Sequence, residues 1–356
     1  MRKLIIIAVV IGVVIGMMMF FQKSPMLATE AFIQRWFTND NGTLATYILD
    51  NEEADADYVQ GREALSESVG LCMVYAVEKQ DVELFEEAYQ MFQVHFYRED
   101  GFIPWKLTEA GVAEVTTNAL VDDLRILHAL YQADELWNRD EYRETADQIG
   151  RFLAVHNMSG NLLTDFYDVK YQQAADVITL SYIDPHALRE MFDRGILSEQ
   201  AYSAMIQVLS EAEMQNGFLA KYYDNTNQVY IYEKEVHMVD QALAAYYRVV
   251  NGDDTGKFLR FVRDELMKNG EIAGVYDSAT QEAVVKYESP AVYGILIWYC
   301  LELGEQELAE ELYERMVEFR DLGVFGRYFG GYSVEDGNTH LFDNLVPLIG
   351  ELRFKQ

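Results

Sequence analysis

The feature that most constrains the fold is a helical pattern of apolar residues that runs through nearly the whole chain. Half of the 356 residues are hydrophobic, and after residue 26 the apolar positions recur every three or four residues, the spacing of one helix face. Short and long connections alternate between these segments, which predicts paired helices. The expected helices cover residues 27–38, 61–79, 82–97, 118–137, 140–156, 184–193, 198–214, 239–250, 255–269, 290–302, 305–318 and 340–351.

Longer aromatic and polar stretches separate the helix pairs. Side-by-side hairpins in a ring would gather these stretches at one end of the molecule. Periodicity alone predicts an all-α fold of helical hairpins and does not separate a closed ring from an open solenoid. One short arm of strands is expected at 228–235, where tyrosines alternate with polar residues. The long stretches cover residues 97–117, 157–183, 216–238, 270–289 and 319–339.

The N-terminus carries a separate apolar segment. An unbroken apolar run of 18 residues, Leu4 to Phe21, follows Arg2 and Lys3. As a helix it would be about 27 Å long, close to the hydrocarbon core of a bilayer. We therefore expect residues 1–25 to be an uncleaved anchor and 26–356 to be one domain outside the cytoplasmic membrane. A cleaved signal peptide, which would leave the domain secreted, is the alternative.

The formal net charge of −31 limits the partners of the chain. Nucleic acids and anionic lipids require a basic surface, so neither is expected to bind. Most of the 59 acidic residues are explained by a solvated surface that keeps the protein soluble. A neutral or amino-sugar polysaccharide remains compatible with the charge, and we expect a monomer.

Cofactor and metal chemistry have little support in the sequence. The six histidines are scattered and there are two cysteines, Cys72 and Cys300, both in apolar helical patterns. These positions predict buried free thiols rather than a disulfide or a metal site. No glycine-rich phosphate loop is present. We expect no cofactor and no metal.

Carboxyl groups at the starts of apolar helices are the strongest chemical signal. Sugar cleavage needs one protonated carboxyl group that donates to the leaving oxygen and one carboxylate that activates water. Glu67 opens an apolar helix, where burial raises the pKa of a carboxyl group and suits it to the acid role. The simpler interpretation is a first-turn glutamate that complements the helix dipole. Asp122, Asp123 and Asp240 also lie at helix starts, and for Asp122 and Asp123 the simpler interpretation is N-terminal capping and complement of the helix dipole.

The segment around Glu67 also resembles a known motif. Residues 66–72 read Ser-Glu-Ser-Val-Gly-Leu-Cys, similar to the Ser-Glu-Gly-x-Gly-Tyr-Gly motif of glycoside hydrolase family 8, whose glutamate is the general acid. Residues 101–105, Gly-Phe-Ile-Pro-Trp, look like the family's Gly-Leu-x-x-Trp loop. The resemblance implies that Trp105 stacks on a sugar ring. Core packing is the alternative for this tryptophan.

Two further segments extend the resemblance. The family has Thr-Asp-x-Asp where this chain has Asp122 and Asp123, and its first aspartate helps to bind the distorted sugar; the alignment leaves open which of the two residues corresponds. Residues 179–185, Thr-Leu-Ser-Tyr-Ile-Asp-Pro, resemble the family's Asn-Pro-Ser-Tyr-Phe-x-Pro. This similarity implies that Tyr182 lies beside the nucleophilic water. Ser181 and Asp184 are then candidates for substrate binding.

Asp240 is the candidate base. When residues 217–219 are aligned with the family's Gly-Leu-Val, the aspartate of its Tyr-Asp-Ala-x-Arg motif falls on Asp240 without a gap. This chain reads Asp-Gln-Ala-Leu from that residue, so the arginine is lost, as are the family's neighbouring Tyr and its Pro-Asp-Trp. A different anchor for the alignment would place the base next to Glu235 instead.

The resemblance covers the chain from about residue 30 to the end. It implies an (α/α)6 toroid that cleaves internal β-linkages of a polysaccharide with inversion of configuration. Because hydrolases of this family occur alongside exopolysaccharide synthesis, an outward-facing enzyme of this type would act on a secreted, biofilm-type polymer. The alternative is a degenerate toroid that binds a glycan without cleaving it.

Overall fold

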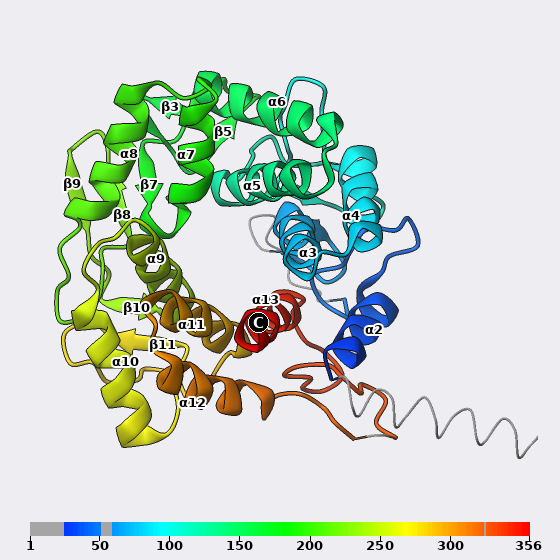
Figure 1. The fold of residues 1–356 in the computed structure, drawn as a ribbon, viewed down its shortest axis with the longest axis vertical. Helices are drawn as coiled ribbons and strands as arrows, with labels where there is room; N and C mark the ends of the chain where they lie inside the picture. The colour runs from blue at the N-terminus through cyan, green and yellow to red at the C-terminus, as the bar shows by residue number, and fades with distance from the viewer. Residues whose placement is uncertain (1–24, 51–58, 324) are drawn as a thin grey trace, which may run out of the picture.

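In the computed structural model, which describes residues 25–50, 59–323 and 325–356, twelve α-helices form a closed ring (Figure 1). Inner helices alternate with outer helices, and the last inner helix packs against the first, which closes the ring. The predicted (α/α)6 toroid is therefore confirmed. The inner helices are α3 (Ser66–Lys79), α5 (Leu120–Trp137), α7 (Pro185–Asp193), α9 (Met238–Val250), α11 (Pro290–Leu303) and α13 (Phe342–Lys355). The outer helices are α2 (Pro25–Phe37), α4 (Val82–His95), α6 (Asp140–His156), α8 (Glu199–Glu211), α10 (Gly256–Asn269) and α12 (Gln306–Val317).

Local capping chemistry explains where several helices begin and end. The side chain of Asp81 accepts a hydrogen bond from the first turn of α4, and Ser198 does the same for α8. Gly304 ends α11 in the left-handed conformation that glycine adopts at low cost. The helix expected over 61–79 begins only at Ser66, because β1 (Ala64–Leu65) pairs with β2 (Lys106–Leu107) instead.

Short antiparallel strands occupy the connections between helix pairs. The expected arm near residue 230 is confirmed as a hairpin of β8 (Tyr222–Asp224) and β9 (Val229–Ile231), and β8 also pairs with β7 (Val177–Thr179). A 3-10 turn, η1 (Leu180–Tyr182), follows β7 directly. The remaining pairs are β3 (Met158–Ser159) with β4 (Leu162–Leu163), β5 (Tyr167–Asp168) with β6 (Gln173–Ala174), and β10 (Glu235–His237) with β11 (Val275–Asp277).

The core lies between the inner and outer helices. Helix α11 is buried on all sides from Pro290 to Cys300, as expected for a helix that is apolar around its whole circumference. Helix α11 lies so close to α13 that a Cβ atom on Gly294 would stand 2.8 Å from the Val346 carbonyl oxygen. Two glycines, Gly294 and Gly350, face each other at this crossing. The predicted free thiols are also found, with Cys300 buried and Cys72 half-buried.

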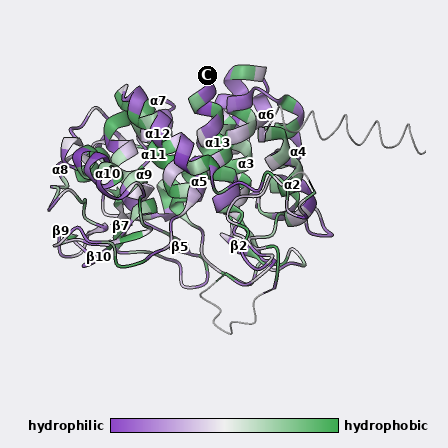
Figure 2. Ribbon diagram, turned by 90° about the horizontal axis from the view of Figure 1, so that it is seen from below, coloured by the Kyte–Doolittle hydropathy of each residue, from purple (hydrophilic) through white to green (hydrophobic). Residues whose placement is uncertain are grey.

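The loops and strands gather at one end of the ring, as the alternating connection lengths predicted. Figure 2 shows β2, β5, β7, β9 and β10 along one edge of the molecule and the C-terminus on the opposite side. We call these the loop end and the C-terminal end. Helices α3 and α9 begin directly after β1 and β10, so their first-turn side chains lie at the loop end.

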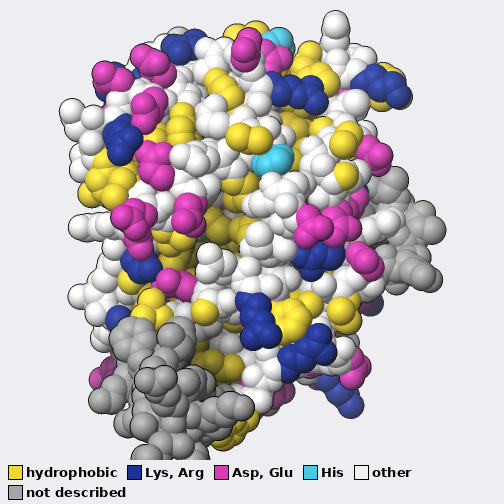
Figure 3. All heavy atoms as spheres, turned by 90° about the vertical axis from the view of Figure 1, so that its right-hand side faces the viewer, with side chains coloured by type: hydrophobic (Ala, Val, Ile, Leu, Met, Phe, Trp, Pro, Cys, Tyr) yellow, Lys and Arg dark blue, Asp and Glu magenta, His cyan; other side chains and the backbone are white. Residues whose placement is uncertain are grey.

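The surface carries mixed charge. On the face that includes α2 and α4, acidic and basic side chains are interspersed around a hollow lined by apolar groups (Figure 3). Within the described part of the chain no helix is long and apolar enough to cross a membrane. Residues 1–24 are not among the described residues, so the structure does not test the anchor expected at residues 1–25.

Candidate active site

Glu67 occupies the first turn of α3 at the loop end. Its side chain is half-buried, and burial raises the pKa of its carboxyl group to about 7. The negative charges of Asp122 and Asp343 act in the same direction, and the positive charge of Arg125 opposes them. A carboxyl group with this pKa is protonated in an appreciable fraction of molecules at neutral pH, which is what a general acid requires.

Asp122 is the partner of Glu67 on the neighbouring inner helix. Its Oδ2 accepts a hydrogen bond of 2.9 Å from Ser66 Oγ, and its Oδ1 lies 2.6 Å from Arg125 Nη1. Gly70 makes room for this arginine, since a Cβ atom there would stand 3.2 Å from Arg125 Cδ. The serine and glycine of the Glu67 motif therefore both support the aspartate across the helix interface.

The side chain of Asp123 lies in the protein core and not beside Glu67. It is fully buried, and Asn118 Nδ2 donates to its Oδ2 at 2.7 Å while its Oδ1 has no hydrogen-bond partner. Burial holds the pKa of Asp123 well above its usual value. Of the two aspartates between which the sequence could not choose, the structure places Asp122 beside Glu67 and Asp123 in the core.

Trp105 lies next to the acid. Ser66 N donates to the Trp105 carbonyl oxygen at 3.0 Å, so the backbone of the tryptophan is fixed to the start of α3. The ring is partly exposed and lies under Lys106, whose Nζ is 5.4 Å from the ring centroid. A half-exposed indole at this position has a face available for a sugar ring.

Asp240 opens α9 on the other side of the ring. Ser181 Oγ donates to its Oδ1 at 3.0 Å, and Lys221 Nζ forms an ion pair with its Oδ2. The carboxylate of Asp240 is about a quarter exposed. This hydrogen bond places Ser181, expected to bind substrate, beside the candidate base.

Tyr182 interacts electrostatically with both Glu67 and Asp240. Burial raises the pKa of its phenol, and the carboxylates of Asp165, Asp122, Asp240 and Glu67 raise it further. The hydroxyl group therefore stays protonated and lies within electrostatic range of both the candidate acid and the candidate base.

Asp165 is a second carboxyl group near the base. It accepts hydrogen bonds of 2.7 Å from both the backbone N and the Oγ1 of Thr179. Burial raises its pKa to about 6, the Thr179 hydrogen bonds and Lys221 lower it, and Asp240 raises it. Nothing in the sequence pattern marked Asp165 or Lys221, because neither opens a helix.

A hollow of about 520 Å³ adjoins Asp240 at the loop end. Tyr47, Tyr287 and Asp343 contribute to its lining, together with His340, whose pKa is lowered by burial. Asp343 lies in the first turn of α13, and its Oδ1 accepts a hydrogen bond of 2.6 Å from Ser289 Oγ. The walls are thus aromatic and polar, a composition that suits a sugar polymer.

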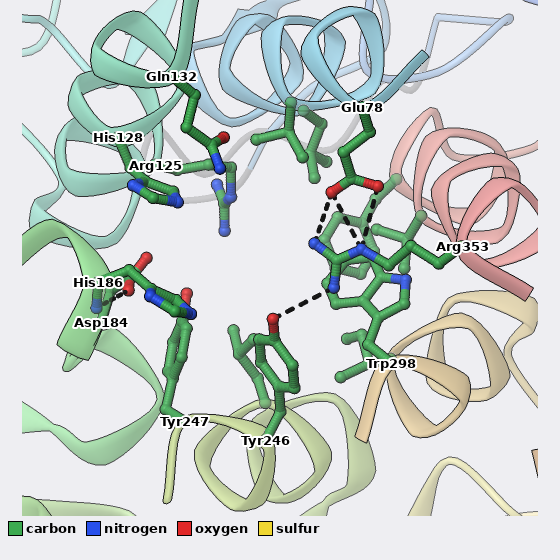
Figure 4. A pocket seen from close by; sticks show the side chains of 16 residues that line it. Glu78, Arg125, His128, Gln132, Asp184, His186, Tyr246, Tyr247, Trp298 and Arg353 are labelled. Carbon is green, nitrogen blue, oxygen red and sulfur yellow. Dashed lines mark hydrogen bonds and ion pairs between the residues drawn. The ribbon is translucent and has the colours of Figure 1, made fainter. Parts of the chain in front are cut away.

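Asp184 is not part of this cleft. Its Oδ1 caps α7 by accepting from His186 N at 2.9 Å and Ala187 N at 3.3 Å. It lines a cavity of about 80 Å³ on the ring axis with His186, Tyr247 and the Glu78–Arg353 ion pair (Figure 4). Glu78 lies 11 residues after Glu67 on α3, about 16 Å along the helix. Glu235, the alternative base, is exposed on β10 and pairs with Asp277 of β11.

Comparisons with known proteins identify the family of the chain. The profile of glycosyl hydrolases family 8 matches residues 12–248, so the chain belongs to that family and is a glycoside hydrolase. Putative lipoprotein YdaJ of Bacillus subtilis (strain 168) is 35% identical over 330 residues, which are 92% of this chain and 87% of that protein.

Two solved structures show the same ring. PssZ from Listeria monocytogenes superposes with a TM-score of 0.75 at 27% identity, covering 91% of this chain and 94% of that one. A protein described as a novel alpha-amylase from Clostridium perfringens gives a TM-score of 0.83 at 22% identity, with 93% and 98% of the two chains covered. At 22% identity, the similarity to the Clostridium perfringens protein shows a shared fold.

Proposed function

We propose that the protein hydrolyses internal linkages of a polysaccharide by an inverting mechanism, with Glu67 as the acid and Asp240 as the base. The single observation that supports this most is the contrast between the two groups. Glu67 is a half-buried carboxyl group with its pKa raised to about 7, whereas Asp240 is a carboxylate paired with an ammonium group. Acid and base roles follow when neighbouring environments separate two carboxyl groups in this way.

The proposed reaction assigns a step to each group. Protonated Glu67 donates its proton to the glycosidic oxygen, and the bond from that oxygen to the anomeric carbon breaks. A water molecule held by Tyr182 and Asp240 attacks the anomeric carbon from the opposite face and gives its proton to Asp240. Asp122 binds the distorted sugar, and Trp105 stacks on a neighbouring ring.

The substrate class is proposed from the charge of the cleft. The cleft carries Glu67, Asp122, Asp165, Asp240 and Asp343 against few basic groups, and this negative field favours a neutral or amine-bearing polymer. A β-linked exopolysaccharide is the proposed substrate. Because the similar Clostridium perfringens protein is described as an alpha-amylase, α-glucans are the necessary comparison.

The proposed location is outside the cytoplasm, where such a polymer accumulates. The domain would be exported behind an N-terminal anchor formed by the apolar run of residues 4–21. The Bacillus subtilis relative carries the name of a lipoprotein, which supports attachment to the outer side of the cell membrane.

The test is a substrate panel for the domain without its first 24 residues. Glucans with β- and α-linkages, chitosan, xylan and native exopolysaccharide are incubated with wild type, Glu67→Gln and Asp240→Asn, and reducing ends are counted. New reducing ends from a β-linked polymer with wild type alone are expected. Cleavage restricted to α-glucan would overturn the linkage, and full activity of Asp240→Asn would overturn the base.

The second candidate function is a glycan-binding toroid without catalysis. The lost arginine after Asp240 and the lost Tyr-Gly after Gly70 favour it. The same panel separates the two, because a binding protein would retain polymer on an affinity gel and release no reducing ends. Glu67→Gln would then leave retention unchanged.

A further inference from the structure

We propose that Lys221 is the positioning residue of the catalytic base and supplies the positive charge that the family places on an arginine three residues after that base. This inference rests on the proposed role of Asp240. Lys221 lies in the segment between α8 and β8, at a position where the family's Pro-Asp-Trp carries an acidic residue. The arginine position is occupied by Leu243.

The backbone around Lys221 is fixed to the elements that carry the site. Lys221 N donates to the Ile231 carbonyl oxygen at 2.8 Å, and its own carbonyl oxygen accepts from Leu180 N at 3.0 Å. Two residues earlier, the backbone of Leu219 makes two hydrogen bonds of 2.8 and 3.1 Å to the buried side chain of Gln241. Because Gln241 adjoins Asp240 in α9, the lysine and the base are held by one hydrogen-bonded unit.

The side chains complete this arrangement. Asp240 receives one donor on each oxygen, Ser181 Oγ on Oδ1 and Lys221 Nζ on Oδ2. Two donors fix the plane of a carboxylate and leave lone pairs on both oxygens for a water molecule. With Lys221 removed, only the serine contact would hold the group.

The surrounding charges show why a cation is needed. Asp165 lies on the same side and interacts with both Lys221 and Asp240. Tyr182 faces the group from η1, while His237, His340 and Asp343 lie across the hollow. The ammonium group of Lys221 contacts Asp240 directly. Removing this lysine would leave the base among carboxyl groups with the Ser181 hydroxyl as its remaining side-chain donor in the described structure.

The test compares Lys221→Met and Lys221→Arg with wild type on a polymer that the wild type cleaves. We expect Lys221→Met to lower kcat by about 10- to 100-fold with little change in KM. The acid limb of its pH profile should move upward, since a cation at contact distance favours the ionised form of a carboxyl group. Lys221→Arg should restore most of kcat and the position of the limb.

Two further variants separate positioning from folding. Lys257→Met, which removes a lysine whose ammonium group donates to the Met214 carbonyl oxygen, should leave kcat and the limb unchanged. Adding Asp165→Asn to Lys221→Met should move the limb back toward wild type, because one repelling charge is removed. A folded Lys221→Met with the wild-type kcat and limb would overturn the proposal. So would a loss that Lys221→Arg does not restore. Activity in Asp240→Asn would instead reject the proposed base itself.

Discussion

The burial that suits Glu67 to proton donation also makes it a destabilising residue above neutral pH. Its carboxyl group has a pKa of about 7 in the folded protein against 4.5 for the ordinary side chain. The folded state therefore holds one more proton than the unfolded state between these values, and stability falls as pH rises through that window. A difference of this size is worth about 3 kcal/mol at most.

Glu67→Gln should remove this pH dependence. The variant should have the wild-type melting temperature near pH 4 and a higher one at pH 8, because the amide carries no charge to desolvate. Thermal unfolding of both proteins across pH 4 to 8 measures the effect. Parallel curves would show that Glu67 is solvated in the folded protein and has no raised pKa.

The adjacent aspartates on α5 should respond differently to the same change. Asp122→Asn removes the negative charge paired with Arg125 and is expected to reduce kcat/KM about 100-fold or more, since substrate contacts at the distorted sugar are worth several kcal/mol. Asp123→Asn replaces a buried carboxyl group whose pKa is held well above its usual value by burial. It should keep its activity and a melting temperature within about 2 °C of wild type. The reverse order of activities would move the sugar site to Asp123.

At the scale of the element, the cap role of Asp184 can be tested against the substrate role suggested by its sequence context. Asp184→Ala should cost about 1 kcal/mol of stability, the usual value for a helix N-cap, and should change kcat/KM less than 2-fold. Asp81→Ala, which removes the N-cap of α4 far from the cleft, is the matched control. A loss of activity in Asp184→Ala that exceeds the control would return this residue to the substrate site.

The elements themselves were largely predictable. Apolar spacing found all twelve helices in the described residues, with most bounds within three residues, because most of these helices bury one continuous face; α11 is apolar and buried all round. The start of α3 was missed because β1 pairs with a segment about 40 residues away, and a local pattern carries no record of such a partner. The residues of the candidate site also differ in how far the sequence could predict them. Glu67, Asp122 and Asp240 open helices and could be found, whereas Lys221 and Asp165 lie on irregular segments that the ring brings together.

At the scale of the whole molecule, the net charge of −31 should select against polyanions. The cleft adds its own carboxylates to this field, and the potential extends about 10 Å at 0.1 M salt. Turnover of a uronate-rich polymer should therefore rise as salt is added, while turnover of a neutral polymer stays constant. Rates for the two polymers at several ionic strengths provide the measurement. Faster cleavage of the polyanion at low salt would contradict the proposed substrate class.

The closed ring places the candidate acid and the candidate base on different inner helices, α3 and α9, with Tyr182 between them electrostatically. In the proposed mechanism the water and the leaving oxygen lie on opposite faces of the sugar. The proposed reaction is therefore a single displacement by water that inverts the configuration at the anomeric carbon, with no covalent intermediate.

The most direct test is proton NMR of the first products formed from a β-linked polymer that the enzyme cleaves. The α-anomer should accumulate first and then mutarotate toward equilibrium, with Glu67→Gln giving no signal. Initial release of the β-anomer would show retention, and the assignment of Asp240 as a base that activates water would then be wrong.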